Sequence, residues 1–209
     1  MNILKNVKSY FLPKEIDFFA ILIQQTQLSH CVSAKLGRHL EDLNPQNLDK
    51  ILDDIDSFRS KRKASLIELH QSFITPVDKE AINRCYAKVY EIELSFKHLI
   101  IELKTYQEID TSYLKESFAF IAKSLAEIID VLSKIENKKY DEALEPIEKI
   151  FHLNNLFSYQ FSKDANRLFK ESEVYKLNVN REILSQFKSI MNHCIQYTND
   201  LSDIIFKLT

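Results

Sequence analysis

The spacing of apolar residues between Ile82 and Leu103 constrains the fold of this chain more than any other feature. An apolar side chain recurs there at every third or fourth position, at Ile82, Cys85, Val89, Ile92, Phe96, Leu99 and Leu103. This spacing matches the 3.6-residue turn of an α-helix and not the two-residue alternation of a strand. A narrow seam of this kind predicts a long helix that packs nearly antiparallel in a bundle.

Five other segments show the same rhythm, so the sequence predicts an all-α protein of six long helices. A single Gly and four Pro in 209 residues leave little material for tight turns, which is typical of a long-helix composition. Three of the other predicted helices run from Pro13 to about His39, from Asn44-Pro45 through Phe73, and from about Tyr140 to Lys170 with an irregularity at Pro146. The remaining two carry apolar seams from Leu114 to Ile135 and from Ile183 to Leu208.

Short connections between long helices favour two three-helix halves, residues 13–108 and 111–209, within one domain spanning 1–209. The seams of the third and sixth helices coincide when offset by about 98 residues. The two halves are therefore interpreted as a diverged repeat of antiparallel three-helix bundles.

Charge and cysteine content restrict the function classes. The formal net charge of −2 gives no general basic field, so nucleic acid is not expected as a partner. No apolar run of about 18 residues and no signal peptide are found, and we expect a soluble, cytoplasmic protein. Cys31, Cys85 and Cys194 are odd in number and widely spaced, which predicts reduced thiols in the core rather than disulfides or a zinc site.

A helix stop and a helix start lie close together between Phe73 and Ile82. Phe73 and Ile74 close one apolar seam, and the residue before a proline avoids the helical region. Thr75 is predicted to cap the next helix with its hydroxyl, and Pro76 to occupy the first helical position, where no donor is needed.

These residues also carry a resemblance to a known family. The signature Phe73, Thr75, Pro76, Asp78, Glu80 and Ile82 resembles the FITPxDREDI motif of PhoU-like phosphate transport regulators, departing from it at Ala81, where the family usually has Asp. The opening segment from Phe11 to Phe19 and the last helix, Glu182 to Lys207, are similar to the family's as well. The resemblance implies two three-helix bundles and, in many members, metal clusters held by acidic pairs on helices two, three, five and six.

The family's metal-ligand positions are degenerate in this chain. A cluster of hard cations needs several converging carboxylates, and acids four apart share one helix face. In helices two and three the positions fall on Ile55 and Arg59, and on Tyr90, Glu91 and Leu94. In helices five and six they fall near Asn154 and Ser158, and on Lys188 and Asn192. Glu91 is the one carboxylate that survives among them. We therefore expect no metal and no other cofactor. Lys188 and Arg59 are expected to reach solvent or to pair with an acid.

Other candidate sites have plainer interpretations. The acids Asp53, Asp54 and Asp56 early in a helix are expected to face water, and the basic run Arg59, Lys61, Arg62 and Lys63 to pair with them rather than with phosphate. His30-Cys31 and His193-Cys194 are adjacent pairs, so neither can ligate one metal from one helix. The basic and apolar segment from Met1 to Phe11 is expected to pack against helix ends, with weak membrane binding as the alternative.

The fingerprints of common enzymes require glycine-rich loops that a chain with one Gly cannot form, so we expect no catalytic activity. The resemblance implies an accessory protein that modulates inorganic phosphate transport through protein contacts, with a transporter at the inner face of the membrane as the partner. The alternative is a helical scaffold or adaptor unrelated to phosphate. A homodimer is a further expectation, because helix pairs with exposed seams often dimerise.

Overall fold

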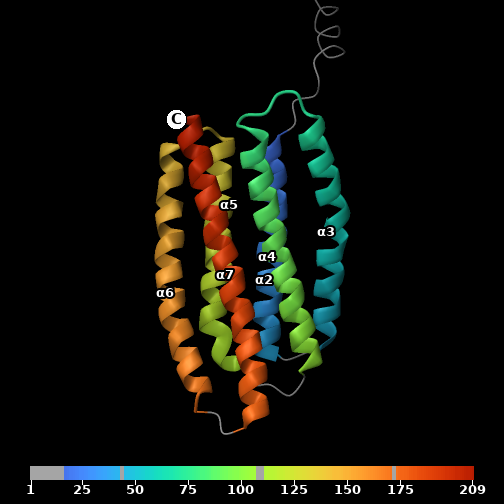
Figure 1. The fold of residues 1–209 in the computed structure, drawn as a ribbon, viewed down its shortest axis with the longest axis vertical. Coiled ribbons are helices and arrows are strands. Elements are labelled where there is room, and N and C mark those ends of the chain that lie inside the picture. Colours follow the sequence, from blue (N-terminus) through green and yellow to red (C-terminus); the bar gives the residue numbers. More distant parts are fainter. Residues whose placement is uncertain (1–16, 43–44, 107–110, 171–172) are drawn as a thin grey trace, which may run out of the picture.

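The computed structural model describes residues 17–42, 45–106, 111–170 and 173–209. Every regular element in these ranges is helical, which confirms the predicted all-α class and the six long helices (Figure 1). The α-helices are α2 (Phe18–Asp42), α3 (Pro45–Gln71), α4 (Lys79–Thr105), α5 (Lys115–Glu136), α6 (Leu144–Leu168) and α7 (Val174–Leu208). Short 3-10 turns, η1 (Ser112–Leu114) and η2 (Asp141–Ala143), precede α5 and α6.

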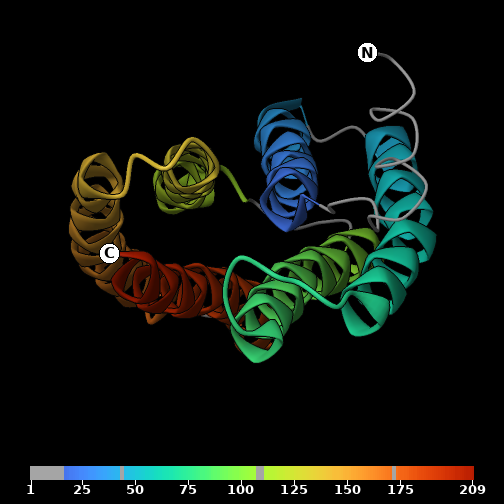
Figure 2. The same ribbon diagram turned by 90° about the horizontal axis from the view of Figure 1, so that it is seen from above.

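The six helices share one apolar core. Seen from above, α2 and α5 lie along one face, α4 and α7 lie along the other, and α3 and α6 stand on opposite sides (Figure 2). The most extensive packing joins α4 to α7 and α2 to α5. At the centre, the rings of Phe96, Phe118 and Phe187 meet edge to face, with centroid distances of 6.3 Å and 5.4 Å. These aromatic contacts join α4, α5 and α7.

Polar side chains fix the antiparallel register of α4 and α7. Arg84 Nε donates to Asp200 Oδ1 at 3.1 Å near the start of α4, and Gln186 Nε2 donates to Glu102 Oε1 at 2.7 Å near its end. The apolar seams of the two helices meet between these contacts. The predicted apolar positions of α4 from Ile82 to Leu103, and those of α7 from Ile183 to Ile204, are all buried.

The start of the first described helix differs from the prediction. Asp17 lies outside the helix, and its Oδ1 accepts a hydrogen bond from the Ala20 N–H at 3.0 Å. Asp17 therefore caps α2, and the predicted start at Pro13 is wrong for the helix that begins at Phe18. Pro13 itself lies outside the described residues. An aspartate satisfies a free N–H of the first turn, which Pro13, lacking a side-chain acceptor, cannot do.

The predicted cap of the third helix is also wrong. Asp78 Oδ1 accepts from the Ala81 N–H at 2.8 Å, so Asp78 caps α4, which begins at Lys79. Thr75 Oγ1 instead donates to the Val77 carbonyl at 2.6 Å. Pro76 precedes the helix rather than opening it. Between Pro76 and the cap, the Val77 side chain is buried, so this part of the connection packs against the core before the helix begins.

The preceding helix ends earlier than predicted. α3 stops at Gln71, and the seam does not continue through Phe73 and Ile74, whose side chains are 92% and 77% exposed. By contrast, Pro45 opens α3 as predicted. The predicted irregularity at Pro146 and the helix start near Tyr140 are wrong, because η2 ends at Ala143 and α6 begins at Leu144. Pro146 therefore lies in the first turn of α6, where a missing N–H costs little.

All three cysteines are free thiols. Cys85 and Cys194 are buried in the core, as expected. Cys31 is exposed, so its prediction as a core thiol is wrong, because it lies on the outer face of α2 next to the buried Val32. Burial raises the pKa of the Cys194 thiol to about 12, which keeps it protonated and unreactive.

Among the described residues, no helix is long and apolar enough to cross a bilayer.

Candidate functional site

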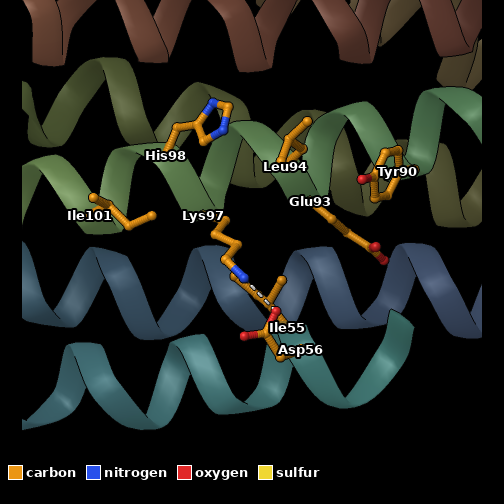
Figure 3. A pocket seen from close by; sticks show the side chains of 8 residues that line it. All are labelled: Ile55, Asp56, Tyr90, Glu93, Leu94, Lys97, His98 and Ile101. Atoms are coloured by element: carbon orange, nitrogen blue, oxygen red, sulfur yellow. Dashed lines mark hydrogen bonds and ion pairs between the residues drawn. The ribbon is translucent and has the colours of Figure 1, made fainter. Parts of the chain in front are cut away.

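A pocket of about 190 Å³ lies between α3 and α4, and three degenerate family positions line it. Ile55 comes from α3, and Tyr90 and Leu94 come from α4. Figure 3 shows these side chains together with the rest of the lining, Asp56, Glu93, Lys97, His98 and Ile101. The place where the resemblance implies a metal cluster is therefore a partly apolar cavity in this chain.

The helical period explains why these residues meet. Tyr90, Glu93, Leu94 and Lys97 follow one another at steps of three, one and three, so they share one face of α4. That face turns toward α3, which packs along α4. The pocket is thus a gap between two long helices rather than a loop site.

Glu93 is the most perturbed group in the pocket. Its side chain is 7% exposed, and no residue that the structure describes donates a hydrogen bond to it. Burial raises the pKa of the Glu93 carboxyl to about 7, and the positive charge of Arg62 acts in the opposite direction. A carboxyl group in this environment changes its protonation state near neutral pH.

Arg62 does not neutralise Glu93 directly. Its guanidinium carbon lies 3.6 Å from the centroid of the Tyr90 ring, a cation–π contact that holds the side chain over the aromatic face. The Arg62 Nε is buried and has no hydrogen-bond partner in the described part of the chain. The structure therefore leaves an arginine and a glutamate near each other without an ion pair between them.

Asp54 and Asp56 of α3 pair with lysines of other helices. Lys97 Nζ of α4 lies 2.5 Å from Asp56 Oδ1, and Lys35 of α2 forms an ion pair with Asp54. The expectation that the run around Arg62 neutralises these acids is wrong for Asp54 and Asp56. Lysines on neighbouring helices reach them across the interface, while Arg62 turns toward Tyr90. The side chains of Arg59 and Lys61 lie outside the described residues.

Glu91, the surviving family carboxylate, does not line the pocket. Lys88 Nζ donates to its Oε2 at 2.7 Å, and His193 Nδ1 of α7 lies 3.1 Å from the same oxygen. Glu91 therefore belongs to the interface between α4 and α7. The structure separates it from Ile55, Tyr90 and Leu94.

The corresponding positions of the second half are mostly polar and open to solvent. Lys188 is exposed, as expected, and its Nζ lies 5.7 Å from the centroid of the Phe161 ring. Ser158 and Asn192 are exposed as well, and Asn154 is half-buried. Among the described residues of the whole chain, no group of three His, Cys, Asp or Glu side chains is placed to hold a metal ion.

The signature residues form a separate feature at one end of the bundle. Ile82 is buried, Glu80 lies 3.6 Å from Arg84, and Asp78 caps α4. Lys207 Nζ also lies 2.6 Å from Asp78 Oδ2, which ties the end of α7 to this loop. We call the exposed residues Phe73 and Ile74 the apolar tip.

Sequence reasoning missed Glu93, Arg62 and Lys97 as site residues. One signal was present: Glu93 follows the seam residue Val89 by four positions, a step that usually leads to an inward-facing side chain. The stacking of Arg62 on Tyr90 had no such signal. It depends on the relative position of two helices.

No protein-family model matches the chain, and no curated protein matches it.

Proposed function

We propose that this chain is a non-catalytic, PhoU-like accessory protein that modulates inorganic phosphate transport through contacts with a protein partner. The partner in this proposal is a phosphate transporter at the inner face of the membrane, and the protein acts from the cytoplasm. The arrangement proposed is two three-helix bundles, α2 to α4 and α5 to α7, related as a diverged repeat.

The helix pairing supports the proposed repeat. If α2, α3 and α4 correspond to α5, α6 and α7, the two most extensive contacts, α2 with α5 and α4 with α7, each join corresponding helices. A pseudo-twofold axis between two similar halves produces this kind of self-pairing.

The apolar tip is the single observation that carries the proposed mode of action. Phe73 and Ile74 belong to the most specific segment of the resemblance, yet they contribute little to the core because both are largely exposed. Adjacent exposed large apolar side chains are typical of contact sites for other proteins. We assign them the transporter contact.

The test measures uptake of radiolabelled phosphate in cells that lack the gene and carry plasmid copies of it. The tip variant replaces both Phe73 and Ile74 with Ser. The control variant replaces Leu156 and Tyr159, two exposed residues in the middle of α6, with Ser. We expect deletion to change uptake, and the wild type and the control variant, but not the tip variant, to restore it.

Two outcomes contradict the proposal. If deletion leaves phosphate uptake unchanged, a scaffold or adaptor unrelated to phosphate becomes the better interpretation. The replacement of the family's metal-ligand positions also favours that interpretation. If the tip variant restores uptake fully, the tip is not the contact.

A prediction about metals follows from the same positions. Protein purified without chelators is expected to contain well under one iron, zinc or manganese ion per chain, because Ile55, Tyr90 and Leu94 supply no carboxylate where the family has acids. Elemental analysis by mass spectrometry measures this content. One or more ions per chain, lost when Glu91 is changed to Gln, would contradict it.

A further inference from the structure

The pocket between α3 and α4 contains one carboxyl group to which no described residue donates a hydrogen bond. Glu93 lines the pocket, is more than nine-tenths buried and accepts no hydrogen bond from the described residues. Figure 3 shows its side chain leaving α4 on the same side as that of Lys97. A buried carboxylate without a donor is costly, so a ligand that brings a donor would stabilise the ionised form.

The other charges around the pocket indicate the sign of the ligand. Asp56 and Lys97 neutralise each other at 2.5 Å, and Arg62 is held over the Tyr90 ring. Glu93 therefore remains the one unpaired acid among the lining residues that the structure describes. A positively charged N–H donor complements it.

The apolar residues that line the pocket indicate the size and polarity of the uncharged part of the ligand. Ile55, Leu94 and Ile101 supply aliphatic surface, and Tyr90 supplies an aromatic ring. A volume of about 190 Å³ is small for a drug-sized ligand. An apolar protein cavity of about 150 Å³ holds one benzene molecule, so a single ring fits.

We propose that this pocket binds a small organic ammonium ion, with the ammonium donating to the Glu93 carboxylate and a single apolar ring against Ile55, Leu94 and Tyr90. This inference does not depend on the proposed role in phosphate transport. When Glu93 is protonated before binding, its proton leaves to the buffer and the ligand keeps its own. No covalent bond forms or breaks beyond this O–H bond.

Several other charged or titratable groups face this region beside Glu93. From α3 these are Arg62 and Asp56, and from α4 they are Tyr90, Lys97 and His98; Lys35 of α2 is paired with Asp54. With a Glu93 pKa of about 7, the ionised fraction falls about tenfold between pH 8 and pH 6. Affinity for the ammonium ion should fall by the same factor.

The experiment titrates the full chain with benzylamine in a calorimeter at pH 8 and pH 6. We expect saturable binding of one ligand per chain, about tenfold weaker at pH 6, with proton release visible as a dependence on the ionisation enthalpy of the buffer. Glu93→Gln should weaken binding at least tenfold and remove the pH dependence. Glu102→Gln is the matched control, since Glu102 is a half-buried carboxyl on the same helix but accepts a hydrogen bond from Gln186.

A neutral probe keeps the test decisive if Glu93→Gln does not fold. Benzyl alcohol has the same ring without the positive charge, and on the wild-type protein it should bind at least tenfold more weakly than benzylamine. The proposal is overturned if benzylamine shows no saturable binding or if the alcohol binds equally well. It is also overturned if a folded Glu93→Gln variant retains the affinity of the wild type.

Discussion

At the scale of single residues, one side chain on the α3–α4 connection has two structural roles. Asp78 caps α4 through the Ala81 N–H and forms an ion pair with Lys207 at the end of α7. The hydrogen bond from Lys207, followed by that from Ala81, lowers the pKa of the Asp78 carboxyl below its ordinary value. Its contribution to stability is therefore present above the pKa of the unfolded chain and is lost as the pH falls through the lower folded pKa.

Asp78→Ala is expected to lower the midpoint of urea denaturation at pH 7, because it leaves an N–H of the first turn without an acceptor. Thr75→Ala is the control, since the Thr75 hydroxyl donates to the Val77 carbonyl within the loop, and its cost should stay below about 0.5 kcal/mol. The difference between the two variants should shrink at pH 2. A larger effect for Thr75→Ala would mean that Thr75 is the cap.

Glu93 is expected to give a pH dependence of the opposite sign. Burial raises its pKa to about 7, so the folded state binds more protons than the unfolded state between the ordinary pKa of 4.5 and 7. The contribution of Glu93 to the free energy of unfolding is therefore fully present at low pH and is lost as the pH rises through that window. The total loss is roughly 3 kcal/mol.

The measurement compares the free energy of unfolding of the wild type and Glu93→Gln at pH 5 and pH 8. Gln cannot ionise, so the variant should gain stability relative to the wild type as the pH rises. If the free energy of unfolding differs between the wild type and the variant by the same amount at pH 5 and pH 8, Glu93 does not titrate in this window.

At the scale of secondary structure, the long helices depend on aromatic contacts at their crossing points. Phe187 of α7 is fully buried and meets Phe118 of α5 at 5.4 Å, whereas Phe206 of the same helix is 70% exposed. The two residues share a type and a helix and differ in burial. Comparing the same substitution at the two positions therefore distinguishes the contribution of side-chain packing from that of helix propensity in α7.

Phe187→Ala is expected to cost about 3–5 kcal/mol, because it removes a buried ring and leaves a cavity between α5 and α7. Phe206→Ala should change stability by less than about 0.5 kcal/mol, as expected for a solvent-exposed position. Chemical denaturation followed by circular dichroism at 222 nm measures both. Similar costs for the two variants would contradict the packing described here.

At the scale of the whole molecule, the two most extensive helix–helix interfaces join the first half of the chain to the second. α2 packs on α5, α4 packs on α7, and the buried residues of all six helices form one cluster. Either half alone would expose the surfaces that these pairs cover. The bundle should therefore fold as a cooperative unit.

Two fragments test this, residues 17–106 and residues 111–209, expressed separately. We expect each to show reduced helicity and a broad, non-cooperative thermal transition, while the full chain melts in a single step. Mixing the two should restore part of the helicity if they reassemble. A sharp transition in either isolated half would show that the halves are independent folding units.

The sequence by itself determined the helical class, the number of long helices and most of the buried face of each. The seam from Ile82 to Leu103 repeats with the helical turn, and side-chain burial follows directly from that period. Helix ends were less accurate, as at Thr75 and Asp78, because several residues in that turn can accept a hydrogen bond and neighbouring packing selects one.

Only the tertiary structure decided how the helices pair and what lies between them. Glu93 and Arg62 are 31 positions apart in the sequence, and their proximity beside Tyr90 depends on how α3 crosses α4. The same holds for the exposure of Phe73 and Ile74, which continue an apolar pattern but lie past the end of α3. A periodic pattern states which face of a helix is apolar, whereas the partner of that face depends on long-range packing that the pattern does not contain.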